Sequence, residues 1–167
     1  MSRSALACTL LCGFLVSLLS STPPARASDK MPTPGPKDTC PVCGMFVSRY
    51  PEWIALVQYE DGVIHFFDGA KDLYKYLLDR HHWAPDRAGK TISRTMVTEY
   101  YSLEMIDAAS AWYVIGSDVL GPMGHELIPL ASREAAAEFL QDHKGVKILK
   151  AEQITLSLLR DLDRGKF

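Results

Sequence analysis

The sequence predicts an α+β fold in which two small β-β-α-β-like halves, at about 40–94 and 95–150, share a mostly antiparallel sheet. The first observation is the turn Glu60-Asp61-Gly62, which separates two strand-like segments and is typical of a β-hairpin. The second is that an amphipathic helical pattern follows a strand-like segment twice. The third is a weak internal repeat, in which 67–79 resembles 130–142 at an offset of 63 residues. Any strand-to-helix unit would look similar, so the repeat is compatible with duplication without requiring it.

The first 27 residues are typical of a secretory signal peptide. Arg3 supplies the positive charge, an apolar run extends from Ala5 to Leu19, and Ala25-Arg26-Ala27 fits a small-x-small cleavage site. The apolar run is shorter than a typical membrane span. We therefore expect an exported chain that is cleaved to begin at Ser28 and has no stable membrane insertion. A lipid anchor is not expected, because the apolar run continues well beyond Cys8.

Behind the signal, residues 28–39 contain three prolines and a glycine, which predicts a stiff, extended linker before a domain at 40–167. Strand-like segments, rich in β-branched and aromatic residues, lie at 53–59, 63–67, 95–105, 112–116, 127–130 and 146–149. Helical patterns lie at 69–80, 132–143 and about 150–163. Asp68 and Ser132 are expected to cap the first two helices.

The composition is that of a globular protein. Hydrophobic residues make up 47% and charged residues 23% of the 167 residues, which is enough apolar material to form a core. The formal net charge is −2, and the sequence contains no basic cluster. Nucleic acid is therefore excluded as the main partner.

The number and spacing of the cysteines limit the kinds of site that the chain can form. Cys8 and Cys12 lie in the predicted signal, so the mature chain keeps only Cys40 and Cys43 and cannot carry a disulfide framework. Thiol–disulfide exchange needs a thiolate at a helix N-terminus, and the residues after Cys43 do not open an amphipathic helix. Structural zinc would need two histidines, drawn from His65 and the pair His81-His82, at a spacing that matches no strong zinc signature. A simple disulfide between the two cysteines also remains open, since an oxidising compartment permits it.

A soft-metal site is the remaining interpretation. Cys43-Gly44-Met45 brings a thiolate and a thioether within one turn of chain, and such ligands favour Cu(I). Gly44 relaxes the backbone between them, and two- or three-coordinate Cu(I) needs no fourth ligand. His65 and Met123 are further candidates, although a structural histidine on a strand and a buried methionine in a turn are the alternatives. The exposed thiol-bearing loop, rather than any catalytic constellation, is the feature of interest, so no enzymatic activity is expected.

These residues resemble the NosL family, the accessory proteins of nitrous oxide reductase, over about 40–149. The segments that carry the resemblance are Cys40-Pro41-Val42-Cys43-Gly44-Met45, Phe66-Phe67-Asp68, Pro122-Met123-Gly124 and Ser132-Arg133-Glu134-Ala135. The resemblance implies a fold related to that of organomercurial lyase, without the lyase activity. It also implies Cu(I) binding in the periplasm and delivery to the copper centres of the reductase or of another copper enzyme, either directly or through the assembly machinery of that enzyme.

Carried over to this sequence, the Cys-x-Met ligands of the family are Cys43 and Met45. Two features depart from the family pattern. Family members are often lipoproteins, which is not expected here, and Cys40 creates a C-x-x-C that not every member has. Cys40 can therefore be a ligand, a disulfide partner or neither. A periplasmic thiol–disulfide or zinc-binding protein that uses Cys40 and Cys43 is the alternative function.

Overall fold

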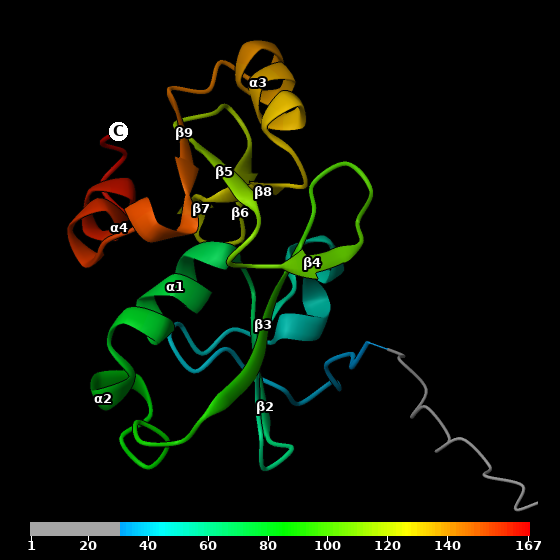
Figure 1. Cartoon of the computed structure of the whole chain (residues 1–167), viewed down its shortest axis with the longest axis vertical. Helices are drawn as coiled ribbons and strands as arrows, with labels where there is room; N and C mark the ends of the chain where they lie inside the picture. The colour runs from blue at the N-terminus through cyan, green and yellow to red at the C-terminus, as the bar shows by residue number, and fades with distance from the viewer. Residues whose placement is uncertain (1–30) are drawn as a thin grey trace, which may run out of the picture. The chain divides into compact units, whose positions relative to one another are not determined.

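The first half of the chain forms a four-stranded antiparallel sheet that begins with the predicted β-hairpin (Figure 1). In the computed structural model of the protein, which describes residues 31–167, the strand order is β2-β1-β3-β4. The strands are β1 (Ala55–Tyr59), β2 (Ile64–Phe67), β3 (Ile92–Thr98) and β4 (Met105–Asp107). In the turn between β1 and β2, Gly62 has a φ of 84°, a left-handed value that glycine adopts at little cost.

The second half forms a separate three-stranded antiparallel sheet with the order β8-β5-β9, beside a small hairpin of β6 and β7. The strands are β5 (Trp112–Ile115), β6 (Leu120–Gly121), β7 (Gly124–His125), β8 (Ile128–Leu130) and β9 (Lys147–Lys150). The α+β class and the antiparallel pairing are thus confirmed, but the expectation that both halves share one sheet is wrong. Because β8 and β9 occupy both edges of β5, no edge of β5 remains for pairing with β4.

Helices cover both sheets. They are α1 (Ala70–Leu78), α2 (Arg80–Trp83), α3 (Arg133–Asp142) and α4 (Leu156–Leu162), with 3-10 turns at Val47–Arg49, Pro51–Trp53 and Ala151–Gln153. Helix α1 packs against β1 and β2 and contacts α4, whereas α3 packs on the second sheet (Figure 1). Ser132 caps α3 as predicted, because its hydroxyl accepts a hydrogen bond of 3.1 Å from the Ala135 N–H. Of the helices in residues 31–167, none has the length and apolar character that crossing a bilayer requires.

Three local expectations fail because side chains make hydrogen bonds that the sequence pattern does not reveal. The strand expected at 95–105 is interrupted, since Glu99 Oε2 accepts hydrogen bonds from the Tyr101 and Ser102 N–H groups and folds 99–104 into a loop. The last helix begins only after Thr155, whose side chain caps α4. Asp68 makes no cap hydrogen bond to α1, and its carboxylate faces the cysteine loop instead.

Two hydrophobic clusters hold the described residues together. The larger one runs from the first sheet through α1 to α4 and includes the side chain of Cys40, which is 1% exposed. The smaller one lies beneath α3 and contains Val114, Ile128, Leu130, Ala136 and Phe139. Residues 31–167 form one compact unit, so residues 31–39 of the expected linker belong to it. The predicted signal peptide at 1–27 lies outside the described residues.

Candidate metal centre

The two cysteines sit on a tight loop that closes on itself before the first sheet. Thr39 and Phe46 form an antiparallel bridge at the ends of the loop. Within it, the Cys40 N–H donates to the Met45 carbonyl and the Gly44 N–H donates to the Cys40 carbonyl, both at 2.9 Å. Gly44 has a φ of 78°, where a side chain would be strained. The loop therefore presents Cys40 and Cys43 as neighbours, and no helix begins at Cys43.

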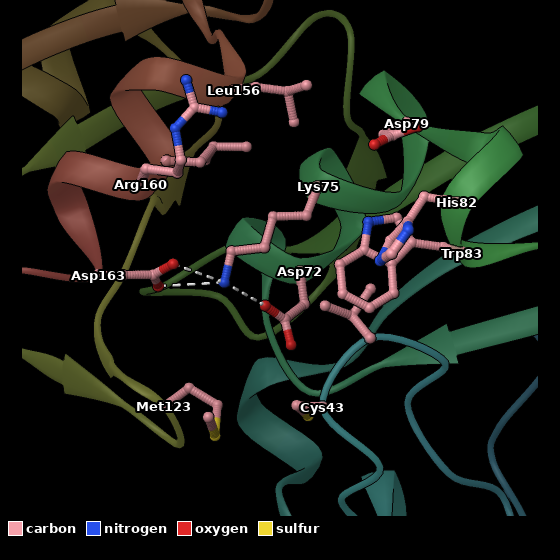
Figure 2. Close-up of a pocket in the computed structure, with 12 residues that line it drawn as sticks. Cys43, Asp72, Lys75, Asp79, His82, Trp83, Met123, Leu156, Arg160 and Asp163 are labelled. Carbon is pink, nitrogen blue, oxygen red and sulfur yellow. Dashed lines mark hydrogen bonds and ion pairs between the residues drawn. The ribbon is translucent and has the colours of Figure 1, made fainter.

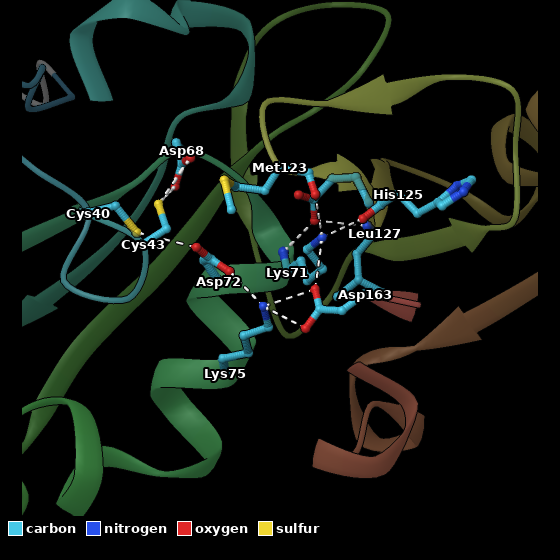
Figure 3. Close-up of polar contacts among 11 residues, drawn as sticks. Cys40, Cys43, Asp68, Lys71, Asp72, Lys75, Met123, His125, Leu127 and Asp163 are labelled. Carbon is cyan, nitrogen blue, oxygen red and sulfur yellow. Dashed lines mark hydrogen bonds and ion pairs between the residues drawn. The ribbon is translucent and has the colours of Figure 1, made fainter. Parts of the chain in front are cut away.

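Two aspartates at the junction of β2 and α1 meet these thiols (Figure 3). The Cys43 thiol donates to Asp68, with Sγ–O distances of 3.1 and 3.3 Å, and the Cys40 thiol lies 3.6 Å from Asp72 Oδ2. One ligand atom from each of the four residues lies within 4.8 Å of the others. Both aspartates are only 2% exposed. The result is a compact group of two sulfur and two oxygen donors.

The thiols of this group are protonated at neutral pH. Burial raises the pKa of Cys43 to about 12, hydrogen bonding from backbone at Met45 opposes the rise, and the Asp68 carboxylate adds to it. Burial is also the main cause that raises the pKa of Cys40 above its usual range, with the charge of Asp72 acting in the same direction. Because metals bind the thiolate rather than the thiol, an incoming ion must displace these protons.

A cavity of about 520 Å³ gives access to the group (Figure 2). Cys43 and Asp72 lie on one wall, and Met123, from the hairpin of β6 and β7, lies on another. Met123 and Cys43 lie side by side in Figure 2, and in Figure 3 the Met123 side chain extends toward Cys43. Lys75 crosses the cavity, where it pairs with Asp72 at 3.1 Å and with Asp163 at 3.0 Å. The remaining lining residues are Val42, Asp79, His82, Trp83, Leu156, Leu159 and Arg160.

The structure brings some of the expected ligands together and separates others. Cys43 shares the four-residue donor group with Cys40 and lines the cavity together with Met123, whereas Cys40 itself is buried and does not line the cavity. Met45 is half-buried on the cysteine loop, where its carbonyl closes the turn, and it does not line the cavity. His65 belongs to β2 and packs between Tyr59 and Tyr76, with ring centroids at 5.8 and 5.5 Å.

His65 lies apart from the group of two cysteines and two aspartates. Burial lowers its pKa, and its Nδ1 is buried without a hydrogen-bond partner among residues 31–167. Its packing corresponds to the structural histidine that was the alternative interpretation. Of the pair considered for zinc, His82 lines the cavity and His81 is exposed.

Sequence reasoning missed Asp68 and Asp72 as members of the centre. The sequence pattern predicts a helix cap at Asp68 and gives no separate signal for Asp72. Asp68 lies just before α1 and Asp72 lies in its first turn, so two acidic residues close to a helix start are a usable signal. The sequence does not show that these residues meet Cys40 and Cys43, because that contact depends on how α1 packs beside the loop.

Comparisons with known proteins identify the family. A family model described as NosL matches residues 32–159. A relative from Stutzerimonas stutzeri named copper-binding lipoprotein NosL is 29% identical over 130 residues, which span 74% of this chain and 65% of the relative's length. The crystal structure of the copper chaperone NosL from Shewanella denitrificans shares the fold, with a TM-score of 0.63 at 21% identity, and the match covers 77% of this chain and 97% of that one. Since the family model matches most of its length, this chain belongs to the NosL family.

Proposed function

We propose that this chain is a periplasmic Cu(I)-binding metallochaperone that delivers copper to a cuproenzyme, with nitrous oxide reductase as the first recipient to test. The observation that carries the proposal is the thiol of Cys43 at the wall of an open cavity, opposite the thioether of Met123. Thiolate and thioether ligands select Cu(I) over hard cations. The names of the two relatives, a copper-binding lipoprotein and a copper chaperone, point to the same metal. The role is carriage of the ion, not catalysis.

Cys43 and Met45 are the proposed principal ligands, and Met123, Cys40 and His65 are candidates for completing the shell. Two observations support these candidates: Met123 lines the same cavity as Cys43, and Cys40 belongs to the same four-residue donor group. Met45 does not line the cavity, so binding through it would require its side chain to turn toward Cys43. His65 is the weakest candidate, because it packs between two tyrosines.

The open cavity supports transfer as well as binding. Cu(I) with two or three soft ligands keeps a position free for an incoming thiolate, thioether or imidazole. A ligand of the partner protein can therefore bind the ion through the cavity before Cys43 releases it. The buried side of the site, with Cys40 at 1% exposure, prevents approach from behind. Transfer then takes place on one face only, the face lined by Trp83 and Leu156.

Zinc binding is a second candidate, and one observation favours it. The sequence offered only histidines to complete a zinc site, whereas the structure places two carboxylates beside the two thiols. Zinc accepts cysteine sulfur and aspartate oxygen in four-coordinate sites. Thiol–disulfide exchange is less well supported, because such enzymes lower the pKa of their attacking thiol, whereas burial raises the pKa of Cys43.

The test is a competition titration of the reduced mature chain against a chromogenic Cu(I) chelator under anaerobic conditions. The parent should bind one Cu(I) per chain. Cys43→Ser should abolish tight binding, because it removes the anionic soft donor that faces the cavity. Met45→Ala should weaken binding without unfolding the chain. Cys40→Ser distinguishes a dithiolate site, in which affinity falls strongly, from a site in which Cys40 takes no part.

Met96→Ala is the matched control for the methionine variants. Met96 is partly buried in β3 and packs against the larger hydrophobic cluster rather than the cavity, so its loss should leave Cu(I) affinity unchanged. His65→Ala should have a small effect if the ring only packs. Tight Cu(I) binding by Cys43→Ser would refute the proposal. Tight zinc binding that depends on Asp68 and Asp72, with weak Cu(I) binding, would favour the second candidate.

Recipient and export need tests of their own. Copper-loaded chain should restore the copper signal of copper-free nitrous oxide reductase, and transfer to a different apo-enzyme alone would reassign the recipient. We also infer cleavage after Ala27 without lipid attachment, although the Stutzerimonas stutzeri relative is named a lipoprotein. The intact mass of the periplasmic protein decides this, since a lipid-modified species contradicts the inference.

A further inference from the structure

The hairpin that carries Met123 is too small to hold its own position. The Met123 hairpin, residues 120–125, consists of two strands of two residues each, β6 and β7. Isolated two-stranded hairpins are at best marginally stable in water. The Met123 side chain is 47% exposed, so its own burial holds it weakly. Contacts to another element must therefore keep this thioether opposite Cys43.

Lys71 supplies the first of these contacts. It lies in the first turn of α1 and is fully buried, with an exposure of 0%. Its ammonium group donates to the Met123 carbonyl at 3.1 Å and to the His125 carbonyl at 2.6 Å (Figure 3). It also pairs with Asp163 at 3.1 Å. One side chain thus ties the turn and the second strand of the hairpin to α1.

Glu126 supplies the contact in the opposite direction. It directly follows the hairpin, is 4% exposed, and accepts hydrogen bonds from the Lys71 N–H at 2.5 Å and the Leu127 N–H at 2.9 Å. Its carboxyl group thereby satisfies a backbone donor in the first turn of α1, where a capping side chain is otherwise absent. A side-chain carbon added at Gly69 would collide with this carboxyl group. The close approach depends on glycine at that position.

These two residues form a reciprocal connection, called here the Lys71–Glu126 clasp. The Lys71 side chain reaches the hairpin backbone, and the Glu126 side chain reaches the Lys71 backbone. Lys71 lies between Asp68 and Asp72 in sequence, so the clasp joins the Met123 hairpin to the segment that contacts the cysteines. We propose that Lys71 and Glu126 are positioning residues of the metal centre, which hold the Met123 thioether opposite Cys43 so that it completes the Cu(I) shell. The inference rests on the proposed copper-binding function.

A purely stabilising role explains the clasp poorly. Removing the Lys71 ammonium group and the Glu126 carboxyl group from water is costly, and replacing buried hydrogen-bonded polar groups by apolar groups of the same shape can be nearly neutral or stabilising. Stability alone would thus be served as well by an apolar contact. An apolar contact has no fixed direction, whereas hydrogen bonds to the Met123 and His125 carbonyls set the orientation of the turn. A preorganised ligand loses less freedom when the ion binds, which increases affinity.

A double-mutant cycle between Glu126→Ala and Met123→Ala tests the inference. Each variant is titrated with Cu(I) against the chelator, and X-ray absorption spectroscopy of the loaded protein counts the sulfur ligands. Residues that orient metal ligands typically change affinity by about 10- to 100-fold when removed. Each single variant should lose affinity within that range and lose one sulfur from the shell. Because Glu126 acts through Met123, the double variant should be no weaker than Met123→Ala alone.

Two further variants separate positioning from folding. Glu126→Gln keeps an oxygen acceptor for the two N–H groups and should recover most of the affinity lost in Glu126→Ala. Tyr74→Phe is the matched control on the same helix, because it removes buried hydrogen bonds to the Ala108 carbonyl and to Tyr113 away from the hairpin. It should leave Cu(I) affinity and the sulfur count unchanged. If Glu126→Ala does not fold, Lys71→Met takes its place in the cycle.

The outcomes distinguish this inference from the function on which it rests. Additive losses in the cycle, or an equal loss in Tyr74→Phe, would show that the clasp acts only through stability and would overturn the inference. If Met123→Ala binds like the parent while Cys43→Ser does not bind, the copper proposal stands and the clasp has no positioning role. If the parent itself fails to bind Cu(I), the proposed function fails and the inference with it.

Discussion

Replacing Glu126 by glutamine should remove a pH dependence of folding stability that the structure builds into the protein. Burial raises the pKa of Glu126 from 4.5 to about 8, against the opposing influence of the Lys71 charge and of hydrogen bonds from two backbone N–H groups. The folded state therefore keeps this proton over a pH range in which the unfolded chain has released it. Stability from this group is present below about pH 4.5 and is lost as the pH rises through about 8.

The size of the effect follows from the shift. One pKa unit corresponds to about 1.4 kcal/mol, so the parent should lose about 3 kcal/mol between pH 6 and pH 9 through Glu126 alone. Glutamine is close in shape to the protonated acid and can accept from the same Lys71 and Leu127 N–H groups. Since glutamine does not titrate, the stability of Glu126→Gln relative to the parent should rise by that amount over the same range.

Urea unfolding of the copper-free protein at several pH values measures this difference. Other titrating groups contribute equally to both proteins and largely cancel when the free energies of unfolding are subtracted. Glu60→Gln is the matched control, because Glu60 is exposed and the chemical change is the same. Its difference from the parent should not vary with pH. A flat difference for Glu126→Gln would refute the reasoning that the buried carboxyl is neutral in the folded protein.

Three further outcomes follow from the described contacts. Since burial raises the pKa of Cys43 to about 12, Cu(I) affinity should increase by about tenfold per pH unit for each thiol proton displaced; chelator competition at three pH values measures it, and a pH-independent affinity would contradict it. Phe139→Ala should lower the free energy of unfolding by about 3–5 kcal/mol, because the ring is fully buried beneath α3; a loss below 1 kcal/mol on urea unfolding would be inconsistent with that packing. Ser132→Ala should lower the free energy of unfolding by about 1 kcal/mol, because the Ala135 N–H loses its hydrogen-bond acceptor. Ser48→Ala, at an exposed position without such a bond among the described residues, should leave the free energy of unfolding nearly unchanged in the same assay.

The β-hairpin and the α3 cap could be predicted because their causes are local. Gly62 adopts a left-handed φ that glycine tolerates, and Ser132 bonds to a residue three positions away. Both signals lie within a few residues of their effect. The cysteine loop belongs to the same class, since Gly44 and the hydrogen bonds between Cys40 and Met45 close it without help from the rest of the chain.

The predictions that fail concern side chains that can hydrogen-bond to either of two groups. Asp68 has the right type and place for a helix cap, yet its carboxylate binds the Cys43 thiol, 25 residues earlier in the sequence. The donor in the first turn of α1 is satisfied instead by Glu126, 55 residues after Lys71. Local propensity names the residues that can cap a helix, but the choice between partners depends on which distant segment arrives there.

The kinds of donor available, and the local turns that present them, follow from the amino-acid sequence. It placed Cys43 and Met45 on one short loop and made a soft-metal site the favoured interpretation. Three further features appear once the chain is folded: Asp68 and Asp72 face the thiols, Met123 lines the same cavity as Cys43, and His65 packs between tyrosines. These contacts join segments far apart in the chain, and the packing of α1 against the first sheet and the Met123 hairpin sets their geometry.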